Sequence, residues 1–374
     1  MVKRIGRIQC CVEDYGVMFE PDLRQTSEDV CRRILVQYEP RVQASHVEAL
    51  GNRGGFSGAS IWRVMTAQGD FALRCWPETG LPRPRILGLH RLLEHLARTG
   101  LAFVAVPLPS RDGSTLVRAA GRDWQLEPWL PGIADFHTRP VRERLRAAMI
   151  ALGQWHLAAE RHQAETDVAG WFGSRASAPS PAAIERLSIL DHANDARLRT
   201  IETSIAVTDA SPMRDVSIQI LNLFRYGRTR IRDLLYQVRE TEVRLHPCLR
   251  DVWHDHLLFH GDELTGLIDP SACRMENVTT DLTRLIGSLV GDNRSEWDFA
   301  LNEYQKLRPL TTRELTLMAA LHHSGVLLNG WTWLEWLFLD RRTFADQIVV
   351  LRRLNEIQRR MESLTDSADF RGFH

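Results

Sequence analysis

The chain has 374 residues, 44% of them hydrophobic, and Lys+Arg and Asp+Glu both total 47, so it is long enough for two domains and has no net charge. The balanced charge excludes a global field that attracts nucleic acid or an anionic membrane, and no apolar run approaches the roughly 20 residues of a membrane helix. The start of the chain has no apolar secretory core and the six cysteines show no CxxC spacing, so we expect a cytoplasmic protein with reduced thiols.

The first half of the chain has the pattern of a small sheet with one helix. Strands, in which apolar and polar residues alternate, are expected at residues 61–66, 71–76, 104–109, 114–119 and 122–126. Residues 86–99 have leucines at helical spacing, and Gly100 ends that helix. We expect residues 41–127 to form the sheet region. Residues 1–40 would be an N-terminal extension of unclear role, with a possible helix at Asp29–Gln37.

The second half, residues 128–374, is expected to be mostly helical. Its helices are predicted at residues 141–161, 213–243, 297–307, 312–338 and 344–364. Residues 173–183 are rich in small side chains and are predicted to form a loop or linker. Trp331, Trp333 and Trp336 lie close together in the sequence and indicate either an aromatic packing surface or a pocket wall.

Two aspartates in the helical half, Asp251 and Asp269, stand 18 residues apart, and each borders an apolar run of strand character. Residues 261–263 supply the turn of a hairpin between them. In protein kinases one such aspartate accepts the proton of the attacking hydroxyl, and a second, after the next strand, holds Mg²⁺ on the phosphates. The alternatives are structural: Asp251 could cap a turn, and Asp269 could form a turn before Pro270.

A glycine-rich segment joins the first strand signals and contains Gly54, Gly55, Ser57 and Gly58. Such a turn lets backbone N–H groups approach phosphate closely, where a bulky side chain would block them. Arg74 follows on the next strand, where a cation could reach the same phosphates. The alternative is a purely structural turn with Arg74 exposed on its strand.

These motifs, taken in order, resemble the aminoglycoside phosphotransferase and choline kinase-like family, which has a protein-kinase-like fold. Residues 249–259 are similar to the family's catalytic His-Gly-Asp-x-x-x-x-Asn segment, and residues 265–271 to its metal-binding segment. Residues 280–282 resemble the start of the following helix, where Asp281 would cap the helix or orient the catalytic loop. Residues 124–132 resemble the linker whose backbone pairs with adenine.

The resemblance implies an α+β, two-lobed protein-kinase-like fold, with a small N-terminal antiparallel sheet lobe and a larger, mostly helical C-terminal lobe. It implies transfer of the γ-phosphoryl group of ATP or GTP to a hydroxyl of a small metabolite. Asp251 would accept the proton, Asp269 and His256 would bind Mg²⁺, and Glu127 and Trp129 would seat the adenine. No feature of the sequence indicates an oligomeric state.

Several positions depart from the family pattern. Arg74 replaces the strand Lys, His256 replaces the catalytic-loop Asn, and no Glu stands where the family's helix Glu is expected. A guanidinium places phosphate oxygens differently from an ammonium, and an imidazole binds Mg²⁺ less readily than oxygen does. These departures leave a catalytically weak pseudokinase, acting as a nucleotide- or ligand-binding regulatory module, as the main alternative.

A second alternative is a transition-metal site that activates water. A His-x-His pair with nearby carboxylates can hold zinc, and a strand would place His254 and His256 on the same face. The candidate ligands in this segment are His254, Asp255, His256, His260, Asp262 and Glu263.

Overall fold

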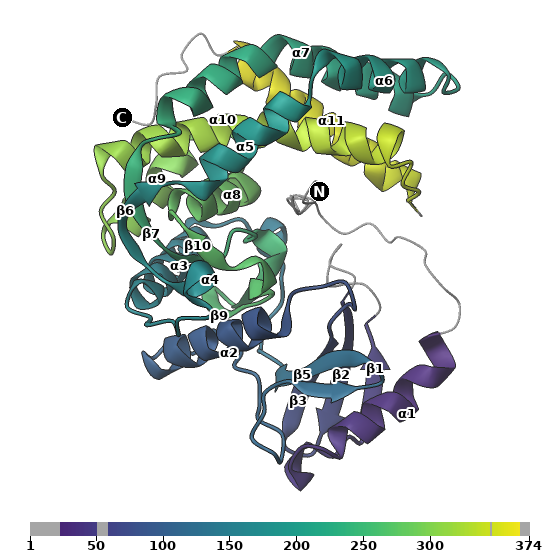
Figure 1. The fold of residues 1–374 in the computed structure, drawn as a ribbon, viewed down its shortest axis with the longest axis vertical. Helices are drawn as coiled ribbons and strands as arrows, with labels where there is room; N and C mark the ends of the chain where they lie inside the picture. The colour runs from purple at the N-terminus through teal and green to yellow at the C-terminus, as the bar shows by residue number, and fades with distance from the viewer. Residues whose placement is uncertain (1–22, 51–58, 345, 367–374) are drawn as a thin grey trace.

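The computed structural model describes residues 23–50, 59–344 and 346–366, and it consists of a small sheet lobe followed by a larger helical lobe (Figure 1). The sheet lobe contains one antiparallel sheet with the strand order β1-β2-β3-β5-β4. Its strands are β1 (His46–Ala49), β2 (Ser60–Thr66), β3 (Gly69–Cys75), β4 (Val117–Ala119) and β5 (Arg122–Pro128). This architecture confirms the α+β fold class that the sequence predicts.

One face of this sheet is packed in a core, and the other face carries the alternate side chains. One face packs against α1 (Leu23–Leu35), where Cys31 and Ile34 are buried in one cluster with Val64, Leu73 and Leu126. Each such aliphatic side chain stabilises the lobe by about 1.5–3 kcal/mol on full burial. Because side chains alternate along a strand, the residues between these core positions point to the opposite face.

Helix α2 (Arg83–Arg98) connects the sheet lobe to the helical lobe. Its leucines at helical spacing, such as Leu92 and Leu96, are buried in the same cluster as residues of the helical lobe. Gly88 lies against Phe172, and an added Cβ would be 3.0 Å from that ring. The small residue therefore permits a close approach between α2 and the helical lobe.

The helical lobe contains eight longer helices, one short helix and several short strands, within the described part of the chain. The helices are α3 (Arg142–Glu160), α4 (Ala169–Phe172), α5 (Pro181–His192), α6 (Asp195–Ala206), α7 (Pro212–Val238), α8 (Thr279–Val290), α9 (Arg294–Gln305), α10 (Thr312–Leu334) and α11 (Gln347–Asp366). The strands are β6 (Arg175–Pro179), β7 (Glu242–Cys248), β8 (Leu257–His260), β9 (Glu263–Leu267) and β10 (Arg274–Glu276). None of the helices in the described ranges is long and apolar enough to cross a membrane.

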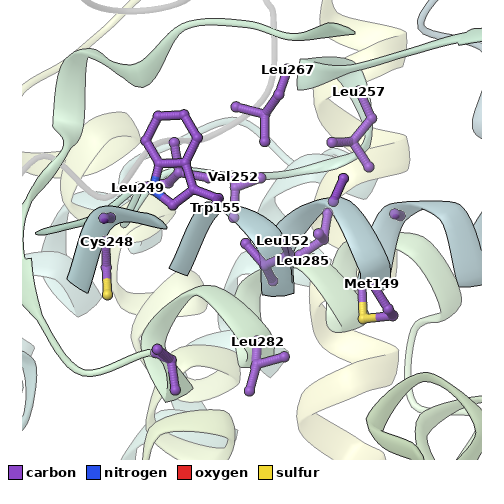
Figure 2. Packing of buried hydrophobic residues seen from close by; sticks show 14 of the residues in the cluster. Met149, Leu152, Trp155, Cys248, Leu249, Val252, Leu257, Leu267, Leu282 and Leu285 are labelled. Carbon is purple, nitrogen blue, oxygen red and sulfur yellow. The ribbon is translucent and has the colours of Figure 1, made fainter. Parts of the chain in front are cut away.

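A hydrophobic core lies directly beneath the segment that carries Asp251. Met149, Leu152 and Trp155 of α3 pack with residues of that segment and of α8 (Figure 2). Leu249 and Val252, which flank Asp251, are both buried in this cluster. The backbone around Asp251 is thus anchored from below on both sides.

Three parts of the predicted secondary structure are wrong. No strand forms at 104–109, where only Val104 makes an isolated bridge, to Leu267. The loop predicted at 173–183 contains β6 and the start of α5, and the helix predicted to reach Val243 ends at Val238. Residues 242–248 form β7, which pairs with β6 on one side and β10 on the other. In β7, Val243 and Leu245 are buried while Glu242 and Arg244 are exposed. This period of two distinguishes the strand from the preceding helix.

The three tryptophans of the second half lie in a core. Trp331, Trp333 and Trp336 are buried together in a cluster formed mainly by α7, α10 and α11. Phe224 stacks on Trp331 with 4.7 Å between ring centroids. The packing interpretation of these residues is therefore correct.

Acid is expected to destabilise the fold, because several histidines are buried in neutral form. Burial lowers the pKa of His90 to about 4 and that of His322 to about 3. The unfolded chain takes up protons at such residues below their usual pKa and the folded chain does not, so stability is complete above about pH 6.5 and falls as the pH falls. Burial also raises the pKa of Asp281, to about 7, which opposes this effect. The histidines whose pKa is lowered nevertheless outnumber the carboxyls whose pKa is raised.

We expect the free energy of unfolding to be lower at pH 5.5 than at pH 7.5 by on the order of 2–4 kcal/mol, measured by urea denaturation. A His90→Gln variant should show a smaller difference between the two pH values. The exposed His192→Gln serves as its control. Equal or greater stability at pH 5.5 would contradict this account.

Candidate active site

A cleft of about 2150 Å³ lies between the two lobes. Residues of β2, β3 and β5 line one side, and residues of α5, α8, α10 and α11 line the other. The segments around Asp251 and Asp269 line the same cleft. Sites for a single small molecule typically enclose about 300–1,000 Å³, so this cleft has room for two substrates.

The predicted hairpin is present and brings both aspartates to this cleft. Strands β8 and β9 pair antiparallel, and Gly261 turns the chain between them with a φ of 61°. Asp251 lies before β8 and Asp269 after β9. Since the hairpin returns the chain to its starting end, the two carboxylates share one wall of the site.

The backbone at Asp251 is held by Asp281, the third residue of α8. The Asp281 carboxylate accepts hydrogen bonds from the backbone N–H groups of Leu249 (2.7 Å) and Arg250 (2.6 Å). Asp281 is fully buried, so these bonds are shielded from water. The alternative that Asp281 orients the catalytic segment agrees with this geometry.

Two further residues complete the support beneath Asp281, and sequence reasoning missed both. His156 lies 3.1 Å from the Asp281 carboxylate through Nε2 and 2.8 Å from the Tyr304 hydroxyl through Nδ1. Burial lowers the pKa of His156 well below its usual value. The neutral ring therefore donates from Nε2–H to Asp281 and accepts from Tyr304 at Nδ1.

The residue before Asp251 is constrained by its own side chain. Arg250 has a φ of 63°, a left-handed conformation that costs a non-glycine residue about 1–2 kcal/mol. Its guanidinium donates to Glu185 of α5 at 2.6 Å, and Glu185 also accepts from Arg274 of β10. These ion pairs tie the segment to α5 and offset the strained backbone.

The Asp251 carboxylate itself is paired with Arg284 of α8. The Arg284 Nη2 lies 2.5 Å from the Asp251 Oδ1, and both side chains are mostly buried. Arg284 lies three residues after Asp281, so one helix holds both the backbone that precedes Asp251 and the Asp251 side chain. The sequence contained no local signal for this pair, because Arg284 could equally face solvent.

The Asp269 carboxylate is paired with Arg74 of β3. Arg74 Nη1 donates to Asp269 Oδ1 at 3.1 Å, so the cation of the sheet lobe and the candidate metal ligand are in direct contact. Burial alone would raise the pKa of Asp269, but Arg74 and His256 outweigh it and hold that pKa below its usual value. The carboxylate is therefore ionised at neutral pH.

Glu127 of β5 takes the place of the missing helix Glu as a second acid near Arg74. Its charge and that of Asp269 together raise the pKa of Arg74 against the effect of burial. Arg74 lies opposite Gln125, whose amide donates to the Glu127 carboxylate at 2.7 Å. Helix α2 contributes His90, which lies 2.9 Å from the Gln125 Oε1. A strand, and not α2, therefore supplies the second acid beside Arg74.

His256 uses both ring nitrogens within its own segment. Trp253 Nε1 donates to His256 Nε2 at 2.8 Å, so Nδ1 carries the proton and donates to the Asp251 carbonyl at 2.9 Å. These bonds brace the loop that carries Asp251. Coordination of Mg²⁺ by His256 stays a prediction, and it would require Trp253 to release Nε2.

The remaining predicted nucleotide contacts are partly described. Glu127 and Trp129 both line the cleft, and Arg63 lies over the Trp129 ring at 4.8 Å. The glycine-rich segment with Gly54, Gly55, Ser57 and Gly58 lies outside the described residues. Its predicted phosphate contacts therefore stay predictions.

The transition-metal alternative does not hold, because its candidate ligands diverge. Asp262 pairs with Arg139 at 3.0 Å, while His254 lies 2.7 Å from the Ser288 hydroxyl. Within residues 23–50, 59–344 and 346–366, three potential ligands converge only at His156, Cys248 and Asp281. That group is the buried support of the catalytic segment described above.

Comparisons with known proteins relate the chain to kinases. A model of the phosphotransferase enzyme family matches residues 48–315. The homoserine kinase of Agrobacterium fabrum is 24% identical over 249 residues, covering 65% of this chain and 66% of that protein. The homoserine kinase of Rhizobium etli is 24% identical over 280 residues, covering 72% and 76%. The chain thus spans about two thirds to three quarters of these relatives.

Solved structures share the fold of this chain. An amicoumacin kinase superposes with a TM-score of 0.64 at 14% identity, covering 92% of this chain and 96% of that one. A spectinomycin phosphotransferase superposes with a TM-score of 0.61 at 11% identity, covering 91% and 95%. These likenesses show the fold, and the family model covers most of the sequence. The chain belongs to the phosphotransferase enzyme family.

Proposed function

We propose that this protein transfers the γ-phosphoryl group of ATP or GTP, with Mg²⁺, to a hydroxyl of a small metabolite. The observation that carries the proposal is the pair of aspartates at the two ends of the β8–β9 hairpin, both facing one interlobe cleft. In this proposal Asp251 is the proton acceptor and Asp269 the metal ligand. The acceptor oxygen attacks the γ-phosphorus, and the nucleoside diphosphate leaves with the electrons of the broken P–O bond.

Asp251 is suited to accept the hydroxyl proton. Its segment is fixed by Asp281 below and by His256 alongside, so the carboxylate needs little reorganisation to act. Proton transfer requires the acceptor oxygen within about 2.6–3.2 Å of that carboxylate. Arg284 occupies one carboxylate oxygen of Asp251, so this ion pair must open or shift when the hydroxyl arrives.

The donor set around Asp269 fits Mg²⁺. Mg²⁺ prefers hard oxygen ligands, and the lowered pKa of Asp269 keeps its carboxylate ionised. Bound Mg²⁺ would neutralise charge on the transferring phosphoryl group. Arg74, now paired with Asp269, would turn its guanidinium to the phosphate oxygens, which bind such a planar fork well.

The cleft also offers a sandwich for a nucleotide base. Ile61 and Ala72 of the sheet line it from one side, and Leu258 and Ile268 of the hairpin line it from the other. Apolar walls of this kind suit a flat aromatic base. The base would lie next to the linker that follows Glu127.

Homoserine is the first acceptor to test, because two relatives carry the name homoserine kinase. It offers a primary hydroxyl on a small molecule, which agrees with the proposed acceptor class.

A pseudokinase is the second candidate, and one observation favours it. Both candidate catalytic carboxylates are engaged by arginines, and His256 has no free ring nitrogen. A protein locked in this arrangement would bind nucleotide or another ligand as a regulatory module without transferring phosphate.

The melting temperature with millimolar ATP or GTP, with and without Mg²⁺, tests the nucleotide site. Ligand at 100 times its dissociation constant should stabilise the protein by about 2.7 kcal/mol. We expect a Mg²⁺-dependent increase that disappears in Asp269→Ala, which removes the metal ligand. Asp262→Ala, on the hairpin turn, should retain it. The absence of any shift with either nucleotide would reject the proposed donor.

A further inference from the structure

We infer that the acceptor carries an oxyanion, a carboxylate or a phosphate, which arginines of α8 and α11 bind beside Asp251. This inference rests on the proposed kinase function and names the substrate class of the same site. Helices α5, α8, α10 and α11 lie on the side of the molecule away from the sheet lobe (Figure 1), and their residues line one half of the cleft.

Arginines outnumber carboxylates on this half of the cleft. The arginines that line it are Arg186, Arg250, Arg274, Arg284, Arg352, Arg353, Arg359 and Arg360. The carboxylates are Glu185, Asp251, Asp255, Asp292 and Glu356. A cleft lined by an excess of one charge concentrates ligands of the opposite charge.

Four of these five carboxylates pair with arginines of the same set, so the excess of positive charge remains on the other arginines. Asp292 accepts from Arg360 through both oxygens, at 2.9 and 3.0 Å, and Glu356 pairs with Arg353 at 3.2 Å. Glu185 is shared between two arginines, Arg250 and Arg274.

Two exposed arginines of α11, Arg352 and Arg359, have no carboxylate partner among the residues that the structure describes. Within the described ranges Arg352 has no acidic partner, and Arg359 donates only to a backbone carbonyl of its own helix, at 3.3 Å. As far as the described residues go, both guanidiniums line the cleft with donors that a ligand can use.

The positively charged side of α11 lies against the helix that holds the catalytic segment. The Arg360 guanidinium packs on Gly287 of α8, where an added Cβ would lie 3.4 Å from its Nη2. Gly287 is three residues from Arg284, which contacts Asp251. An anion bound among these arginines would therefore place a hydroxyl on the same molecule close to Asp251.

Arg284 connects recognition of this anion to the chemistry. Its guanidinium is paired with the Asp251 carboxylate. An acceptor oxyanion would compete for the planar fork of Arg284, which binds carboxylate and phosphate groups through two parallel hydrogen bonds. Asp251 would then be released to take the hydroxyl proton. A cationic acceptor would be repelled by the same arginines and would leave Asp251 paired.

Matched acceptors that differ in one anionic group test the inference. Activity with hydroxybutyrate is compared with activity with butanediol, which lacks the carboxylate. Activity with glycerol phosphate is compared with activity with glycerol, which lacks the phosphate. Aminobutanol is the cationic acceptor. One charge-assisted hydrogen bond changes binding by about 10- to 100-fold. We expect kcat/KM to be higher by that factor for at least one anion than for its neutral counterpart. The pair with the larger difference shows whether the oxyanion is a carboxylate or a phosphate.

Variants of the two exposed arginines test the site itself. Arg352→Gln and Arg359→Gln should each raise KM for the preferred anion about 10-fold and leave KM for the nucleotide unchanged. Arg199→Gln is the matched control, because Arg199 is exposed on α6 and does not line the cleft. Arg284→Gln should also reduce the preference for the anion over its neutral counterpart.

The inference is overturned if neutral or cationic acceptors are used as well as the anions, or if the α11 variants bind the anion normally. If none of these compounds is phosphorylated, melting of the nucleotide-loaded protein with each compound decides instead. Equal shifts for anionic and neutral members would reject the oxyanion site. If the nucleotide still raises the melting temperature in a Mg²⁺-dependent way, only the oxyanion site is rejected. If it does not, the proposed kinase function itself is rejected.

Discussion

Replacing Asp251 with Asn is expected to lower kcat by about 100- to 10,000-fold, which is the contribution of a positioned general base. Asn is nearly isosteric but cannot accept the hydroxyl proton at neutral pH. The backbone support from Asp281 does not involve the Asp251 side chain, so the loop should keep its conformation. KM for the nucleotide should therefore change little, and steady-state kinetics would separate the two effects.

Asp255→Asn is the matched control for this experiment. Asp255 lies in the same segment and lines the same cleft, and its carboxylate lies 3.5 Å from the His254 Nε2. We expect it to keep most of the activity. A normal kcat in the Asp251→Asn variant would show that Asp251 takes no part in the chemistry. If the variant instead transfers no phosphate but the function of the protein is unchanged, the protein is a pseudokinase.

The fold was largely predictable because its signals are local. The β8–β9 hairpin follows from two apolar runs around a glycine turn, so the sequence alone placed Asp251 before its first strand and Asp269 after its second. Strand β6 was missed because Ala and Ser give a weak alternation, and its pairing with β7 depends on residues far along the chain. Local propensity does not carry such information.

The site was only partly predictable, for the same physical reason. Arg74 could be proposed from its strand position and Glu127 from the resemblance of residues 124–132 to the adenine linker, but their approach depends on the register of β3 against β5. Arg284, Glu185 and His156 act through contacts with residues distant in sequence. A helical Arg or His has no local pattern that distinguishes a buried partner from a solvated side chain.

Removing the Arg74 guanidinium is expected to affect the fold as well as the nucleotide site. Arg74 is 6% exposed, and it lies between the acidic groups of Asp269 and Glu127. Breaking a buried ion pair from one side typically costs about 3–5 kcal/mol, because the remaining charge is left without a partner. We therefore expect Arg74→Met to lower the free energy of unfolding by about that amount at pH 7.5, measured by urea denaturation.

The pH dependence follows from the carboxylates that Arg74 leaves behind. In the native protein the pKa of Asp269 is held below its usual value, so its contribution to stability is present at neutral pH and lost only as the pH falls through that lowered pKa. Without Arg74, burial would raise the pKa of both acids. Protonation would then relieve the repulsion between the Asp269 and Glu127 carboxylates. The loss of unfolding free energy in Arg74→Met, relative to the native protein, should therefore be smaller at pH 5.5 than at pH 7.5.

A double-variant cycle isolates the ion pair from lost packing. Asp269→Asn combined with Arg74→Met removes both charges and should be more stable than Arg74→Met alone, because no unpaired Asp269 carboxylate is buried. Arg63→Met is the matched control, since Arg63 lines the same face of the sheet but is more exposed and pairs with Asp70 near solvent. Strictly additive effects of the two changes would show that the 3.1 Å contact between Arg74 and Asp269 contributes nothing to stability, and Arg74 would then matter only when phosphate is bound.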